Sequence, residues 1–227
     1  MKLSHIALAT AILPVATFAQ TDDSQYNTSD NTKGYIGLNI NYSKVQLNDK
    51  LGEYLSNLTG YNIDTDEVIN PNYYGFSLNA GAQFNKYFGL EGFLQKTDSS
   101  TAKINFYYDG TEIGEYKSKT SFLAFGLDAL GYVPIKNSKF SFLGSMGIGY
   151  YNLHGKFEGT SYAYEISESD SDDENNIAFR IGFGGQYAFS ERWALKGMIR
   201  YVALNYDDDE DVVEGLVDIS LGARYTF

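Results

Sequence analysis

The sequence predicts an all-β protein, an eight-stranded antiparallel transmembrane β-barrel. Three observations predict this fold. Apolar and polar residues alternate without a break through residues 214–227, the same alternation returns in seven earlier segments, and the links between segments are alternately short and long. Such a barrel points apolar side chains outward and polar ones inward, which reconciles an apolar content of 43% with a mean hydropathy of −0.30.

The predicted strands follow one another along the chain. Each carries the two-residue period over about 8 to 14 residues, close to the roughly 9 to 11 that span a bilayer. They cover residues 35–42, 73–84, 88–95, 123–133, 140–150, 177–189, 193–201 and 214–227. Aromatic residues recur near their ends, where amphipathic rings favour the membrane interface: Tyr74, Phe84, Phe88, Phe140, Phe189, Trp193 and Phe227.

The last strand shows the period most clearly. A soluble sheet can also have one apolar face, but this strand runs to an aromatic terminal residue. Its outward set is Val217, Ile219, Leu221, Ala223, Tyr225 and Phe227, and its inward set is Glu214, Asp218, Ser220, Gly222, Arg224 and Thr226.

The connections predict the topology. Residues 85–87, 134–139 and 190–192 form short links, whereas 46–72, 159–176 and 207–213 form long ones. This is the alternation of short periplasmic turns and long extracellular loops that bacterial membrane barrels show. The third strand is expected to continue to an Asp109-Gly110 turn and to return along 112–120, so that the surplus projects as a small sheet. Phe106, Tyr107 and Tyr108 would lie on it, either solvated or as a contact surface.

The first residues of the chain predict an export signal. Met1 and Lys2 precede an apolar stretch, and small residues precede a cut after Ala19. The expected division is therefore a signal peptide at 1–19, a polar periplasmic segment at 20–33 and a barrel domain at 34–227. The chain has no cysteine, which excludes disulfides and a lipid anchor, and its net charge of −12 excludes nucleic acid as a partner.

Charged residues recur on the inward face of the predicted strands. Isolated charges inside a narrow barrel cost several kcal/mol each, so these must pair. A network that plugs the lumen is favoured over an ion or proton path, because eight strands enclose only enough room for their own side chains. Its members are Glu91, Asp128, Arg180, Lys196, Arg200, Asp218 and Arg224.

Catalysis has little support. His154 is expected near the outer mouth, where some outer-membrane lipid hydrolases place a histidine. Lipid A deacylases carry a serine two positions later, but this chain has Lys156, and no Gly-x-Ser-x-Gly elbow occurs. No catalytic residue and no cofactor are predicted.

Two acidic runs, 165–174 and 207–211, are expected in the long loops. Their carboxylates could contact cations or basic partner surfaces, although the spacing of a calcium loop is absent and a solvated rim is the default. No metal site is predicted. The candidate contact residues are Asp170, Asp172, Asp173, Asp207, Asp208, Asp209 and Asp211.

From residue 34 the chain resembles the small eight-stranded outer-membrane proteins grouped with the OmpA transmembrane domain, the opacity-type porins and the OmpX/Ail adhesins. The motifs GYIGLNINYS, FGLEGFLQK and LGARYTF carry this resemblance. It implies the outer membrane of a Gram-negative bacterium, contact with outer-membrane lipid, and recognition of Tyr225 and Phe227 by the assembly machinery. It also implies a monomer with a possible host or matrix ligand.

The resemblance favours a non-enzymatic surface protein that contributes to envelope integrity, and it allows a further role in adhesion. A narrow passive channel for small solutes is the alternative, and an envelope lipid-modifying enzyme centred on His154 is third.

Overall fold

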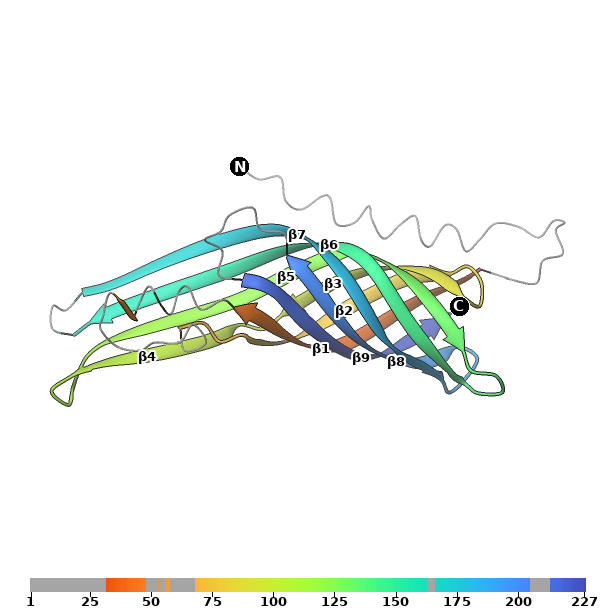
Figure 1. Ribbon diagram of the computed structural model, residues 1–227, viewed down its shortest axis with the longest axis horizontal. Helices are drawn as coiled ribbons and strands as arrows, with labels where there is room; N and C mark the ends of the chain where they lie inside the picture. Colours follow the sequence, from red (N-terminus) through yellow and green to blue (C-terminus); the bar gives the residue numbers. More distant parts are fainter. Residues whose placement is uncertain (1–31, 48–52, 54–55, 58–67, 163–165, 205–212) are drawn as a thin grey trace.

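The computed structural model describes residues 32–47, 53, 56–57, 68–162, 166–204 and 213–227. These residues form nine antiparallel strands (Figure 1). The strands are β1 (Lys33–Leu47), β2 (Asn72–Gln83), β3 (Phe88–Thr97), β4 (Ser100–Tyr108), β5 (Thr111–Pro134), β6 (Phe140–Ser161), β7 (Ile166–Ala188), β8 (Trp193–Leu204) and β9 (Val213–Thr226).

Eight of these strands close into a ring. The sheet order is β3-β2-β1-β9-β8-β7-β6-β5-β4, and a further pairing joins β3 to β5. That pairing matches Phe88–Lys96 with Leu123–Gly131 and closes the barrel. The ninth strand arises because the predicted third strand is interrupted at Asp98 and Ser99, so that its continuation, β4, pairs with β5 and with no other described strand. The predicted eight-stranded antiparallel barrel is therefore confirmed.

The period of two places side chains on opposite faces, as predicted. Leu38 and Phe179 point outward and are 57% and 66% exposed, whereas their chain neighbours Asn39 and Ala178 point inward and are 3% and 0% exposed. The aromatic residues predicted at the strand ends are also exposed, apart from the half-buried Phe140. An apolar outer surface of this extent is stable in contact with lipid and not in contact with water.

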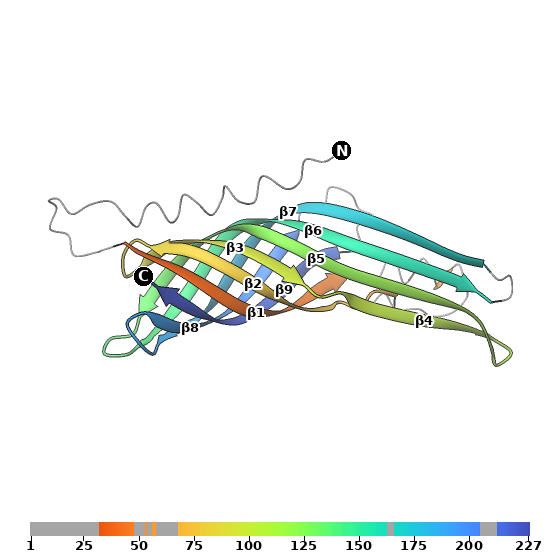
Figure 2. The ribbon, with the colours of Figure 1, turned by 180° about the vertical axis from the view of Figure 1, so that it is seen from behind.

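β5, β6 and β7 continue past the ring and, together with β4, extend the sheet beyond the barrel (Figure 2). We call this extension the projecting sheet: β4, β5 before Phe122, β6 after Tyr151, and β7 before Ile177. Among the described residues β7 pairs with β8 from Ala178 onward, and the part of β7 before it pairs with β6. The expected loop at 159–176 is thus wrong, because β6 continues to Ser161 and β7 starts at Ile166.

The turn of the β4–β5 hairpin has the predicted chemistry. Asp109 and Gly110 adopt positive φ angles of 49° and 75°, as a tight hairpin turn requires at both central positions.

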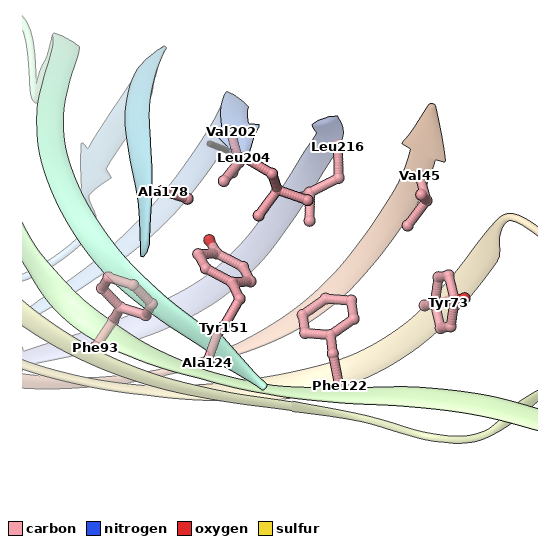
Figure 3. Close-up of a cluster of buried hydrophobic side chains, with 10 residues drawn as sticks. All are labelled: Val45, Tyr73, Phe93, Phe122, Ala124, Tyr151, Ala178, Val202, Leu204 and Leu216. Atoms are coloured by element: carbon pink, nitrogen blue, oxygen red, sulfur yellow. The ribbon is translucent and has the colours of Figure 1, made fainter. Parts of the chain in front are cut away.

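Two apolar clusters fill the lumen at different levels. The larger contains aromatic rings of β2, β3, β5 and β6 facing aliphatic side chains of β1, β8 and β9 (Figure 3). The smaller comprises Tyr35, Leu130, Tyr132, Leu143 and Met198. On β5 the buried Asp128 lies between Leu130 of the smaller cluster and Ala124 of the larger. The lumen is therefore packed above and below a charged layer.

Several predictions lie outside the described residues: the signal peptide at 1–19, nearly all of the polar segment at 20–33, and Asp207, Asp208, Asp209 and Asp211. In the described part of the chain, no helix is long and apolar enough to cross a membrane.

Candidate functional site

The charged layer of the lumen contains the inward residues that the sequence singled out. All seven are buried, with exposed fractions of 4% or less: Glu91, Asp128, Arg180, Lys196, Arg200, Asp218 and Arg224. Each stands on a barrel strand where the alternation points it inward. Six of them form one connected network, and Arg224 lies apart from it.

Glu91 of β3 and Lys196 of β8 make the closest ion pair of this network. The Lys196 ammonium donates to Glu91 Oε1 at 2.7 Å, and Asn79 of β2 donates to the same oxygen at 2.7 Å. The Arg200 guanidinium lies 3.8 Å from Glu91. One carboxylate thus joins strands on opposite sides of the ring.

Arg200 connects the remaining carboxylates. Its guanidinium lies 3.5 Å from Asp128 and 3.7 Å from Asp218. Arg180 of β7 adds a second contact to Asp128 at 3.4 Å, and its guanidinium stacks on the Phe93 ring, 3.5 Å from the centroid. Stacking on an aromatic face lets a buried guanidinium keep favourable electrostatics in an apolar setting.

Neutral side chains complete the shell of Asp218. Ser43 donates a hydrogen bond to it at 2.7 Å, Gln95 at 2.9 Å and Asn41 at 3.3 Å. Sequence analysis missed these three residues. The inward register of polar residues on the first and third predicted strands was a signal that could have identified them.

Arg224 is held without a carboxylate among the described residues. It donates to Tyr132, Gln186 and Gln83, each at 3.0 Å, and its guanidinium lies 3.6 Å from the centre of the Tyr35 ring. Hydrogen-bond acceptors and a π-face replace the missing counter-ion. This arrangement fills the lumen at the level of the smaller apolar cluster.

The projecting sheet separates its charges between two faces. Its outer face, continuous with the outward face of the barrel, carries four lysines. Lys103 is the direct cross-strand neighbour of Lys117, and Lys119 is that of Lys156. Lys103 pairs with Glu115 at 2.8 Å and Lys156 with Glu158 at 2.6 Å, so the outer face carries charges of both signs, with four lysines beside Glu115, Glu158 and Asp173.

The inner face of the projecting sheet, continuous with the lumen, has a different character. Phe106, Tyr116 and Phe157 stand on it, and the Tyr116 and Phe157 rings stack with centroids 6.4 Å apart. Its edge on β7 carries Glu168, Asp170 and Asp172, all exposed. The predicted acidic contact residues Asp170 and Asp172 therefore lie on a strand and not in a loop, and Asp173 points to the outer face.

The aromatic hairpin predicted to project is also divided between faces. Tyr107 and Tyr108 are 52% and 72% exposed near the turn. A bulge between Phe106 and Tyr107 shifts the register, and Phe106 is half-buried on the inner face. The three residues therefore do not form a single patch.

His154 lies on the outer face of β6 and forms a hydrogen bond with Asp173 of β7. Its Nδ1 is 2.7 Å from Asp173 Oδ1, and both side chains are more than half exposed. Ser121 of β5 is the cross-strand neighbour of His154, which no reading of the linear sequence revealed. Among the described residues the side-chain hydrogen bonds of His154 extend to Asp173 and not to Ser121, so a nucleophile–base contact is not formed.

Two lysine–glutamate pairs on the projecting sheet shift the pKa values of their members. The hydrogen bond from Lys103 lowers the pKa of Glu115 and raises the pKa of Lys103. The hydrogen bond from Lys156 lowers the pKa of Glu158 in the same way.

Over the described residues, no group of three His, Cys, Asp or Glu side chains is arranged to hold a metal ion.

Comparison with known proteins agrees with this geometry. A sequence model of the family "Outer membrane protein beta-barrel domain" matches residues 5–227. No curated protein matches the chain significantly.

The chain is also similar to several solved structures at low sequence identity. A major outer membrane protein from Thermus thermophilus is 13% identical, with a TM-score of 0.52, covering 85% of this chain and 99% of that one. Ail of Yersinia pestis, solved with the heparin analogue sucrose octasulfate, is 20% identical, with a TM-score of 0.47 and coverage of 86% and 99%. The N-terminal β-barrel domain of Pseudomonas aeruginosa OprF is 13% identical, with a TM-score of 0.46 and coverage of 87% and 100%. These identities concern the fold alone.

Proposed function

Because the chain belongs to the family of outer membrane protein β-barrel domains, and therefore resides in the outer membrane of a Gram-negative bacterium, we propose that it is a non-enzymatic surface protein. It stabilises the envelope and presents its projecting sheet as a contact surface outside the cell. One observation carries this proposal: a closed barrel with a charge-filled lumen continues into an exposed sheet whose two faces differ in chemistry.

The packed lumen supports a structural role over transport. Glu91, Asp128 and Asp218 are 0 to 1% exposed and in contact with cationic side chains. A solute would have to displace these contacts, and removing one partner from a buried ion pair costs about 3 to 5 kcal/mol. The barrel therefore acts as a rigid anchor.

The outer-face lysines support a role in envelope integrity. Lys119 precedes the outward apolar stretch of β5 by a few residues, and Lys156 follows that of β6, so both lie just above the lipid-facing surface. Like charges directly opposite one another on a sheet repel. Phosphate groups of the outer leaflet would relieve that repulsion and link the protein to neighbouring lipids.

Tyr225 and Phe227 fit the proposed contact with the assembly machinery, since both rings lie on the closing strand and Phe227 is 64% exposed. We also propose that the protein is a monomer, because the ring leaves no barrel strand edge unpaired among the described strands.

Conductance in planar bilayers tests the closed lumen. Purified protein should give no sustained, ion-selective steps at voltages where a porin control conducts. Sustained selective steps would overturn the plug and favour the passive channel.

The envelope and contact roles are tested in intact cells. Loss of the protein should raise sensitivity to detergent and to chelators of divalent cations, and wild-type protein should restore resistance. Intact cells should be retained on lipid, glycan or matrix surfaces through the projecting sheet. Equal resistance and equal retention with and without the protein would reject the proposal.

A further inference from the structure

The inner face of the projecting sheet combines an acidic edge with an apolar floor. On its four strand segments the alternation places no Lys or Arg side chain on this face, within the residues described. Along β7, carboxylates at 168, 170 and 172 alternate with serines at 167, 169 and 171, which point to the outer face. The negative charge of the edge is therefore not neutralised from within its own face.

A hollow lies beside this edge, over Gly159 of β6. An open surface depression of about 390 Å³ is lined on this face by Phe106, Tyr116, Ile166 and Glu168. An adjoining cavity of about 630 Å³ is lined by Tyr116, Phe157 and Asp170 on this face. The two share Tyr116, Gly159 and Glu168.

The hollow exists because residue 159 is a glycine. A Cβ built there meets no atom within 4 Å, so the floor is open space between the Tyr116 ring on one side and Glu168 on the other. The cross-strand register Tyr116–Gly159–Glu168 therefore presents, in one row, an aromatic ring, a gap and a carboxylate.

The spacing of the carboxylates indicates what kind of ligand fits. Same-face residues of a strand repeat every two positions, about 6.6 to 6.8 Å. An extended polypeptide has the same repeat, so basic residues at every second position would each meet one carboxylate of β7. A small polyamine or metal ion would use the charges but not the apolar hollow.

We propose that the inner face of the projecting sheet binds an extended, cationic amphipathic polypeptide segment. Basic side chains lie against Glu168, Asp170 and Asp172, and an apolar side chain enters the hollow over Gly159. This inference specifies the kind of partner that the proposed contact surface binds, and it rests on the proposed function. Carboxylate pairing gives orientation and salt sensitivity, while burial of the apolar side chain gives affinity.

The test uses the full-length protein in nanodiscs of neutral phosphatidylcholine, with empty nanodiscs as background. The probe is a fluorescent peptide, Lys-Ser-Lys-Ser-Lys-Ser-Leu-Ser-Phe, followed by anisotropy. Binding should weaken as salt rises, because charges separated by more than about 8 Å are screened at physiological ionic strength. Replacing Leu and Phe of the peptide by Ser should lower affinity, and replacing Lys by Glu should abolish binding.

Two triple variants with the same net charge locate the site. E168Q/D170N/D172N removes the inner-face carboxylates and should lower affinity roughly tenfold. E115Q/E158Q/D173N removes three outer-face carboxylates and should leave affinity unchanged. Equal losses in both variants would show general attraction to an acidic protein and would overturn the proposal.

Gly159→Leu tests the hollow without removing charge. Its Cβ has free space, so the barrel should fold with an unchanged heat-modifiable gel shift. The variant should lose the affinity difference between the apolar peptide and its Ser analogue, and retention of that difference would overturn the hollow as the apolar subsite. Wild-type protein that binds no cationic peptide would reject this inference alone, since the conductance and envelope experiments test the proposed function separately.

Discussion

At the scale of single residues, the lumen shows why charge position is easier to predict than charge pairing. The period of two placed Glu91, Asp128, Lys196 and Arg200 inside, and burial then requires each of them to find a partner. Which partner each one meets depends on the ring closure, because Glu91 and Lys196 are 105 residues apart in sequence.

Arg224 illustrates the limit of such prediction. It was expected in a carboxylate network, yet it is held by Tyr132, Gln83, Gln186 and the face of Tyr35. When several neutral hydrogen-bond acceptors and an aromatic face converge on a guanidinium, they can take the place of a carboxylate partner. Such convergence from four strands cannot be derived from a linear pattern.

Glu91→Gln should destabilise the barrel by about 3 to 5 kcal/mol, because it leaves the buried Lys196 ammonium without a carboxylate. Combining it with Lys196→Met should recover part of that loss, since the orphaned charge is then gone. Urea unfolding followed by the fluorescence of the single tryptophan, Trp193, measures both variants. A double variant no more stable than Glu91→Gln would contradict the pairing.

The Lys103–Glu115 pair gives a prediction about pH. The pKa of Glu115 is lowered from 4.5 by the hydrogen bond from Lys103. Because the folded-state pKa is depressed, the pair's contribution is present above the unfolded value and is lost as pH falls through the folded value. Lys103→Met should move the Glu115 midpoint, read from its carboxyl carbon by NMR, up toward 4.5. An unchanged midpoint would show that the pair does not form in solution.

At the scale of elements, the barrel strands were predictable and the outer half of β7 was not. Apolar alternation predicts the barrel strands, and Leu38, Leu127 and Phe179 are examples of its outward set. Residues 167–172 alternate serine with acid, and 173–176 are acids and asparagines. This pattern has no apolar face, and the segment was therefore predicted as a loop. Their strand conformation comes from pairing along β6, a tertiary cause that composition conceals.

Leu221→Arg tests the outward register of β9. Leu221 lies in the middle of the strand, 54% exposed on the outward face, so an arginine there meets lipid at a cost of about 2 to 4 kcal/mol near the midplane. Leu221→Met is the matched control and should fold normally. Its inward neighbour Ser220 is no neutral control, because it accepts a hydrogen bond from Arg200. If the Leu221→Arg variant had the same unfolding free energy in lipid vesicles as the wild type, the outward register of β9 would be wrong.

Phe227→Ala separates assembly from stability. The backbone N–H of Phe227 donates to Gly34 at 3.0 Å, which the variant retains, and the exposed ring contacts Tyr225. The amount of folded protein in the outer membrane of cells should therefore fall, while protein refolded in detergent should unfold as the wild type does. A normal amount in cells would remove Phe227 from the proposed assembly signal.

At the scale of the whole molecule, the barrel and the projecting sheet are two parts with different physical support. The barrel is closed by β3–β5 pairing and filled by two apolar clusters and a charged layer. In the part of the chain that the structure describes, the projecting sheet is held by other segments next to the lumen, for example where the Ser118 hydroxyl donates to the Val68 carbonyl at 2.6 Å. Contact residues on such a sheet can therefore vary without disturbing the anchor.

Shortening both hairpins should consequently leave the barrel intact. Residues 101–119 and 154–173 would each be replaced by Asn-Gly, which joins the register pairs Ser100–Thr120 and Leu153–Glu174 through a two-residue turn. The lost hydrogen bond of Ser118 costs about 1 kcal/mol, and shorter connections offset part of it. We expect a normal heat-modifiable gel shift, an unfolding free energy within about 1 kcal/mol of the wild type, and no binding of the cationic peptide. If the shortened chain fails to fold, the projecting sheet is part of the barrel's folding unit; if it folds and still binds the peptide, the contact surface lies elsewhere.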